Sequence, residues 1–156
     1  MEYLGNDLKD DLKDGFFPED DARIIIKQVL DGLNYLHNQG ISHRDVKIAN
    51  IVKAHANKPK SMDIKLVDMG FSMFFEKSQG MEGCCGSPIY MAPEIFLGHK
   101  YTENVDIWAV GITLFKLMVG DSNRYSPYVE KLACVQDMIQ LAKGLVKKDR
   151  HEIPVS

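Results

Sequence analysis

The sequence is poor in cysteine. Only three of its 156 residues are cysteine, and two of these, Cys84 and Cys85, are neighbours. An odd count without C-x-x-C spacing is typical of neither a disulfide framework nor a zinc site. We therefore expect reduced thiols and a location in the cytoplasm, with the nucleus as the alternative.

Long apolar runs and an excess of basic charge are missing as well. No run approaches the roughly 18 apolar residues of a membrane-spanning helix, and the first residues lack the basic and apolar regions of a signal peptide. With 19 Lys and Arg against 22 Asp and Glu, the net charge of −3 gives no general basic surface for nucleic acid. We therefore expect neither membrane insertion nor nucleic-acid binding. The 45% apolar and 26% charged residues are typical of one globular domain.

Several segments show the apolar spacing of helices. The clearest spans 18–40, where apolar residues recur every three or four positions, acidic residues occupy the start and a glycine follows the end. A short helix is expected over 7–14. Residues 104–119 are apolar on nearly all sides and predict a buried central helix, in which Asp106 is an anomaly. A last helix is expected over 126–145.

Strand signals are few and short. The β-branched stretches 51–52 and 64–67 flank a polar segment and predict a small hairpin. Residues 69–93 have no sustained period and contain four glycines, so we expect a long surface loop there. Loops of that length are usually functional or disordered.

Polar clusters fall where turns, loops or a helix start are expected. They are His43-Arg44-Asp45, Asp68-Met69-Gly70, Ser87-Pro88, Ala92-Pro93-Glu94 and the isolated Asp106. Taken singly, each is compatible with a solvated turn, a loop boundary or a capping side chain. Their common order and spacing carry the functional information.

Together these clusters resemble the motifs of the eukaryotic protein kinase family. Residues 43–50, HRDVKIAN, resemble the catalytic loop H-R-D-L-x-x-x-N, and residues 68–70, DMG, resemble D-F-G. Residues 86–94, GSPIYMAPE, resemble the end of the activation segment, and residues 106–111, DIWAVG, resemble the start of the family's central helix. The resemblance implies an α+β fold: a mainly helical C-terminal kinase lobe with a small β-hairpin at the cleft.

The resemblance also implies how the chain is organised. Residues 1–156 would form a partial kinase domain with a hinge at 1–5, the catalytic loop at 43–50, an activation segment at 68–94 and the central helix at about 104–119. The family's Gly-rich loop and phosphate-binding lysine precede the hinge, so we expect the N-terminal lobe to be absent and the face that packs on it to be exposed. In the family, a glutamate like Glu94 pairs with a later arginine, for which Arg124 and Arg150 are the nearest candidates.

Each site residue receives a role from the resemblance. Asp45 is expected to orient the acceptor hydroxyl and take its proton, with Lys47 beside the transferring phosphate. A lysine at that position marks the serine/threonine class. Asn50 and Asp68 are expected to bind Mg²⁺, which prefers oxygen ligands.

ATP is the co-substrate that the resemblance implies. The backbones of Glu2 and Leu4 are expected to meet the adenine edge, Asp7 to approach the ribose, and Val52 to form part of the adenine-pocket floor. Alternatively, Glu2 and Leu4 belong to a frayed N-terminus without a role in binding. Core packing explains the apolar Val52 as well as an adenine contact does. The expected partner is a protein substrate with a Ser or Thr acceptor. In the family, a large residue after D-F-G, here Phe71, accompanies a preference for serine.

Activation has two possible explanations. In such kinases the arginine before the catalytic aspartate, here Arg44, often pairs with a phosphate on the activation segment. The matching position is Gly83, and Glu82 lies beside it. We expect either that Glu82 supplies the negative charge or that the segment needs no phosphate.

Two functions remain open from the sequence. The first is a serine/threonine protein kinase that transfers the γ-phosphate of ATP to a protein hydroxyl, with full activity belonging to the complete domain and little to these residues alone. The second is a non-catalytic module, pseudokinase-like or truncated, that binds partners. The intact Asp45, Lys47, Asn50 and Asp68 favour the first.

Overall fold

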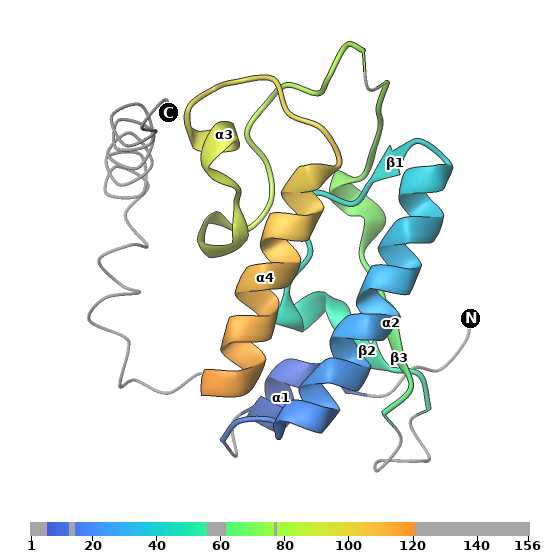
Figure 1. Cartoon of the computed structure of the whole chain (residues 1–156), viewed down its shortest axis with the longest axis vertical. Helices are drawn as coiled ribbons and strands as arrows, with labels where there is room; N and C mark the ends of the chain where they lie inside the picture. The colour runs from blue at the N-terminus through green and yellow to red at the C-terminus, as the bar shows by residue number, and fades with distance from the viewer. Residues whose placement is uncertain (1–5, 13–14, 56–61, 77, 121–156) are drawn as a thin grey trace, which may run out of the picture.

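Two long antiparallel helices form the centre of the computed structural model, which describes residues 6–12, 15–55, 62–76 and 78–120. They are α2 (Glu19–Asn38) and α4 (Asn104–Val119), and they lie side by side in Figure 1. At one end His37 Nε2 lies 2.8 Å from Asp106 Oδ2. At the other end the Phe17 backbone N–H donates to Leu117 O at 2.8 Å. The end of α2 is thereby fixed against the start of α4.

α2 confirms the clearest prediction from the sequence. It begins after Pro18, its first turn is acidic, and it ends before Gly40, whose φ is 71°. Acidic side chains favour the electropositive start of a helix, and glycine adopts the left-handed conformation at low cost. Its buried stripe consists of Ala22, Ile25, Ile26, Val29 and Leu33. Leu36 is only partly buried but packs on the same core.

α4 has the predicted bounds, but its burial is one-sided in the part of the chain that the structure describes. One face buries Val105, Asp106, Ala109, Val110, Thr113 and Leu117. The other face exposes Ile107, Trp108, Phe115 and Met118. An apolar pattern shows that a face can be buried, but it does not show which neighbour covers it. The prediction of burial on nearly all sides is therefore wrong within these residues.

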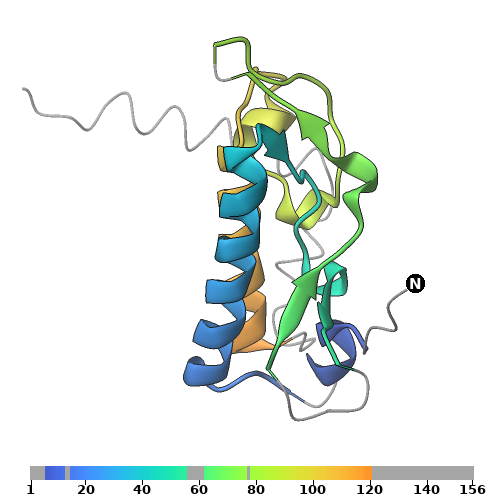
Figure 2. The same cartoon turned by 90° about the vertical axis from the view of Figure 1, so that its right-hand side faces the viewer.

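The strands lie on one side of the helix pair, as Figure 2 shows. β2 (Ile51–Lys53) pairs antiparallel with β3 (Ile64–Leu66), with Ile51 opposite Leu66, which confirms the predicted hairpin. β1 (Ile41–Ser42) pairs antiparallel with β4 (Met73–Phe74). The sequence did not predict this second pair, because strands of two residues have no detectable period.

The short helix α1 (Leu8–Leu12) confirms the predicted helix near the N-terminus. Asp10 N donates to Asp7 Oδ1 at 3.1 Å, so the Asp7 side chain caps the helix start. Leu8 and Leu12 are buried in the same core as the stripe of α2. α1 thus holds the beginning of the described chain next to the β2–β3 hairpin.

Residues 69–93 contain more structure than the sequence predicts. They hold 3-10 turns at Met69–Phe71 and Pro88–Tyr90 as well as β4, and the helix α3 (Pro93–Phe96) begins at their end. A second buried cluster ties this segment to the start of α4: Met81, Met91, Ala92, Ile95, Tyr101 and Val105. The expected surface loop is therefore partly anchored, because its few apolar side chains pack on α4.

The prediction of a mainly helical α+β fold with a small hairpin is confirmed for the described ranges. None of their helices combines the length and apolarity that crossing a membrane requires. The hinge at 1–5, the helix expected over 126–145, and Arg124 and Arg150 lie outside the described residues. The absence of an N-terminal lobe stays a prediction.

Candidate active site

A single buried carboxylate holds the backbone of the loop that follows β1. Asp106, 1% exposed, accepts hydrogen bonds from the backbone N–H groups of His43 at 2.9 Å and Arg44 at 2.8 Å. The Ser42 hydroxyl donates to it at 2.9 Å, and His37 Nε2 lies at 2.8 Å. These partners offset the large cost of burying a charge. The anomalous aspartate of the apolar helix is therefore explained by the loop that it binds.

Two strained backbone positions accompany this loop. Arg44 (φ 64°) and Asp68 (φ 66°) are the non-glycine residues with positive φ in the part of the chain described here. Arg44 is held by Asp106, and the Asp68 carboxylate accepts from Gly70 N at 3.2 Å. Such conformations persist where the surroundings fix them, and they concentrate at functional sites.

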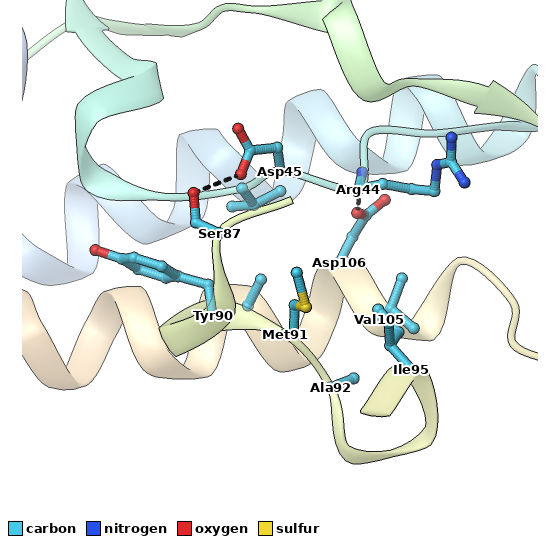
Figure 3. Close-up of a pocket in the computed structure, with 11 residues that line it drawn as sticks. Arg44, Asp45, Ser87, Tyr90, Met91, Ala92, Ile95, Val105 and Asp106 are labelled. Atoms are coloured by element: carbon cyan, nitrogen blue, oxygen red, sulfur yellow. Dashed lines mark hydrogen bonds between the residues drawn. The ribbon is translucent and has the colours of Figure 1, made fainter. Parts of the chain in front are cut away.

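Three predicted or motif-bearing side chains converge at Asp45. Lys47 Nζ lies 2.6 Å from Asp45 Oδ2 and 3.0 Å from Ser87 Oγ. The Ser87 hydroxyl donates to Asp45 Oδ1 at 2.9 Å, as the dashed line in Figure 3 shows. Asn50 Nδ2 donates to the Asp45 backbone oxygen at 2.8 Å and lies 3.2 Å from Oδ2. The structure thus joins the predicted catalytic loop to the predicted activation segment.

Gly86 permits this junction. Its φ is 95°, and a Cβ atom at this position would overlap the carbonyl oxygen of Arg44. Any side chain would push the segment away from the loop and move Ser87 away from Asp45. A glycine here is therefore a requirement of close backbone approach.

A pocket lies next to this junction, between the loop, the 3-10 turn Pro88–Tyr90 and the start of α4. Figure 3 shows Asp45 and Ser87 on one side, Ile95 and Val105 on the other, and Met91 between them. Arg44 and Asp106 also line the pocket, so polar and apolar side chains share its lining. Asp7 and Val52, the predicted ribose and adenine residues that the structure describes, do not line it.

The two predicted metal ligands are adjacent along the backbone of the hairpin. Val67 N donates to Asn50 O at 2.9 Å, and Asp68 follows directly. The side-chain nitrogen of Asn50 is bound to Asp45, and within the described ranges no hydrogen bond reaches its side-chain oxygen. The Asp68 side chain is exposed. This pair of oxygen donors fits Mg²⁺.

No larger metal cluster accompanies this pair. The residues that the structure describes contain no group of three or more His, Cys, Asp or Glu side chains that could hold a metal ion. That Asn50 and Asp68 bind Mg²⁺ together with ligands from phosphate or water, as is usual for this ion, stays a prediction.

The nucleotide residues are brought together only in part. Asp7 and Val52 form an antiparallel backbone bridge, and Lys53 N donates to Asn6 O at 3.0 Å. Glu2 and Leu4 lie outside the described residues. The Asp7 carboxylate caps α1, and Val52 is half-buried in β2.

Sequence reasoning missed two residues of the site, His37 and Tyr101. His37 is the last-turn residue of α2 that faces Asp106, and the Tyr101 hydroxyl accepts from Arg44 Nη1 at 3.1 Å. Burial raises the pKa of Tyr101, while the hydrogen bond and charge of Arg44 lower it in part. Neither residue carries a periodic signal. Their positions, six residues before His43 and five before Asp106, were the available clue.

The structure also contradicts one of the two explanations of activation. The carboxylate of Glu82 lies 3.1 Å from Lys100 Nζ, whereas the Arg44 guanidinium binds Phe71 O and Tyr101. The expectation that Glu82 supplies the charge at Arg44 is therefore wrong. That the segment needs no phosphate stays a prediction.

Comparisons with known proteins agree with this geometry. The family model described as protein kinase domain matches residues 1–153. The chain is 38% identical over 133 residues to probable serine/threonine-protein kinase fhkB of Dictyostelium discoideum, covering 83% of this chain and 11% of that protein. It is 38% identical over 125 residues to serine/threonine-protein kinase 33 of Mus musculus, covering 76% of this chain and 26% of that protein.

A third relative covers more of the chain. Calcium-dependent protein kinase 4 of Plasmodium berghei is 37% identical over 161 aligned residues, covering 94% of this chain and 30% of that protein. The chain thus spans between about a tenth and a third of the length of these relatives.

We expect Asp106→Asn to destabilise the fold. An amide can replace only one carboxylate oxygen as an acceptor, so at least one buried donor loses its partner. Hydrogen bonds to charged groups are worth roughly 1.5–3 kcal/mol, and we expect a loss of that size in the free energy of unfolding, measured by urea denaturation. Asp31→Asn, which removes an exposed pairing with Lys27, is the control and should change it by less than about 1 kcal/mol. Equal effects of the two substitutions would contradict this explanation.

Proposed function

This chain belongs to the protein kinase family, and we propose that it carries the catalytic and metal-binding residues of an ATP-dependent serine/threonine protein kinase. The reaction would transfer the γ-phosphate of ATP to a Ser or Thr hydroxyl of a protein. The observation that most supports this proposal is the mutual contact of Asp45, Lys47, Asn50 and Ser87. The serine/threonine kinases among its relatives support it as well.

Asp45 is the proposed acceptor of the substrate proton. Phosphoryl transfer has a loose transition state, so catalysis relies on positioning and on stabilising charge. The acceptor hydroxyl would donate a hydrogen bond to Asp45 and give up its proton as its oxygen bonds to the γ-phosphorus. The bond from that phosphorus to the bridging oxygen breaks in the same step, and ADP leaves with that oxygen.

Substrate must displace a group that now covers Asp45. The Asp45 side chain is 1% exposed, and the Lys47 ammonium, on a side chain that is 24% exposed, lies 2.6 Å from its Oδ2. Of roughly four acceptor positions on the carboxylate, the contacts with Lys47, Asn50 and Ser87 use three. We propose that the Lys47 ammonium turns from Asp45 to the transferring phosphate when substrate binds. The same movement opens Asp45 to the hydroxyl and places a positive charge where negative charge develops.

Asn50 and Asp68 are the proposed ligands of Mg²⁺. When bound, the ion neutralises charge on the phosphates of ATP. Asn50 can serve because its nitrogen is already fixed on Asp45, which directs its oxygen away from that bond. We further propose that Asp7 and Val52, with Glu2 and Leu4, contact the ribose and adenine of ATP. The backbone bridge between Asp7 and Val52 supports this grouping.

A phosphate-transfer assay tests the proposed function. The whole polypeptide encoded by the gene is incubated with radiolabelled ATP, Mg²⁺ and a generic basic protein substrate. Asp45→Asn is expected to lower the rate at least about 100-fold, which is the usual lower effect of removing a general base, while Asp31→Asn should leave it unchanged. A rate that is the same with and without Asp45 would support the non-catalytic alternative.

Residues 1–156 alone are expected to be poor catalysts in this assay. They contain no G-x-G-x-x-G sequence, the motif that covers the phosphates in the family. We expect turnover well below the roughly 1–100 per second usual for kinases. Turnover in that range that disappears with Asp45→Asn would contradict this expectation.

We expect serine to be preferred over threonine as the acceptor. Phe71 follows the Asp68-Met69-Gly70 motif and is exposed. Its side chain is therefore not packed in the core and is accessible to a substrate. Its bulk should disfavour the extra methyl group of threonine. Two peptides that differ only in Ser or Thr, compared by kcat/KM with the whole polypeptide, provide the measurement. Faster phosphorylation of the Thr peptide would show the assignment to be wrong.

A further inference from the structure

Arg44 has a neutral partner where the sequence suggested a charged one. Its Nε donates to Phe71 O at 2.7 Å, and its Nη1 donates to the Tyr101 hydroxyl at 3.1 Å. Among residues 6–12, 15–55, 62–76 and 78–120, no carboxylate forms an ion pair with Arg44. The contacts that hold the predicted activation segment beside Arg44 therefore do not include a carboxylate bound to this arginine.

Tyr101 connects that arginine to the middle of the predicted activation segment. Its side chain is buried, with the residue 3% exposed. The hydroxyl lies 2.8 Å from Gly83 O and 3.3 Å from Glu82 O, and its single proton can be donated to one of them at a time. Its lone pairs remain available to the Arg44 donor. One hydroxyl thus joins the catalytic loop to residues 82–83.

The rest of the segment is fixed on either side of this contact. Tyr101 and Met81 form a backbone bridge, with N–O distances of 3.0 and 2.6 Å. Gly86 packs against the Arg44 carbonyl, and Ser87 donates to Asp45. Between these points, the Glu82–Lys100 pair is exposed on both sides, and such pairs contribute little. From the interior, the Tyr101 hydroxyl contacts the backbone oxygens of Glu82 and Gly83, and Met91 Sδ lies 3.9 Å from the Cys84 thiol, a weaker hydrogen-bond partner.

We propose that the Tyr101 hydroxyl holds residues 82–86 against the catalytic loop in the unmodified chain, in place of a phosphate on that segment. Burial raises the pKa of Tyr101, so the hydroxyl keeps its proton at neutral pH and can donate it. The consequence for regulation rests on the proposed function: with residues 82–86 fixed, Ser87 stays on Asp45 and the substrate-facing segment is ready without prior phosphorylation.

Hydrogen–deuterium exchange of the 156-residue chain tests this proposal. Tyr101→Phe keeps the ring and its packing and removes only the hydroxyl. We expect the amides of residues 81–86, of which the Met81 N–H donates to Tyr101 O, to exchange about fivefold faster in this variant, the effect of losing one hydrogen bond. Amides in the middle of α2 should keep their rate, whereas a merely structural loss of packing would speed up both. Phosphatase treatment of the unaltered chain should leave the exchange of residues 82–86 unchanged.

Matched variants complete the test. Tyr35→Phe, at a tyrosine 68% exposed on α2, should have no effect on residues 82–86, and neither should Glu82→Gln. Arg44→Lys keeps the charge and the backbone bond to Asp106 but loses the planar guanidinium, so it should speed up exchange of residues 82–86 as Tyr101→Phe does. If Tyr101→Phe does not fold, Arg44→Lys provides the same test on its own.

Three results would overturn the proposal. The first is unchanged protection of residues 82–86 in the Tyr101 and Arg44 variants, and the second is an equal loss of protection in Glu82→Gln. The third is faster exchange after phosphatase treatment. Because exchange is measured without catalysis, any of these outcomes is distinguishable from an absence of kinase activity.

Discussion

The buried carboxylate of Asp106 is the interaction on which the rest of the site depends. It binds the backbone of His43 and Arg44, and these residues precede Asp45 directly. The same bonds fix the left-handed backbone of Arg44, and therefore the direction of its guanidinium toward Phe71 and Tyr101. A helix that packs on α2 thus supplies the contact that positions the predicted catalytic loop, so Asp106 links the hydrophobic core to the candidate site.

The site itself is a set of contacts between segments far apart in the sequence. Asp45 meets Ser87 across 42 positions, and Arg44 meets Tyr101 across 57. Gly86 permits the approach by having no side chain, and Asp106 fixes the loop from the other side. Because each contact restricts the others, the predicted catalytic loop and activation segment are expected to behave as one unit, which would hold the proposed proton acceptor Asp45 in place before a substrate binds.

The sequence predicted those features that have a local cause. The apolar period and flanking residues of α2 and α4 gave their positions, and β-branched stretches gave the β2–β3 hairpin. The motif resemblance grouped Asp45, Lys47 and Asn50, which the structure brings together. It did not predict β4, the exposed face of α4 or the role of Tyr101, because each depends on which distant segment lies opposite. The prediction that Glu82 pairs with Arg44 was wrong for the same reason. Its actual partner, Lys100, is brought beside it by the backbone bridge between Met81 and Tyr101.

The most direct test of the central role of Asp106 is the exchange rate of the backbone amides that it binds, measured by NMR on the unaltered chain. A buried carboxylate that holds them should allow the His43 and Arg44 amides to exchange only when the whole fold opens. Their protection is then predicted to equal that of Val29 and Leu33 in the core of α2. Exchange of these two amides at the rate of an exposed loop, with the α2 amides still protected, would contradict the account.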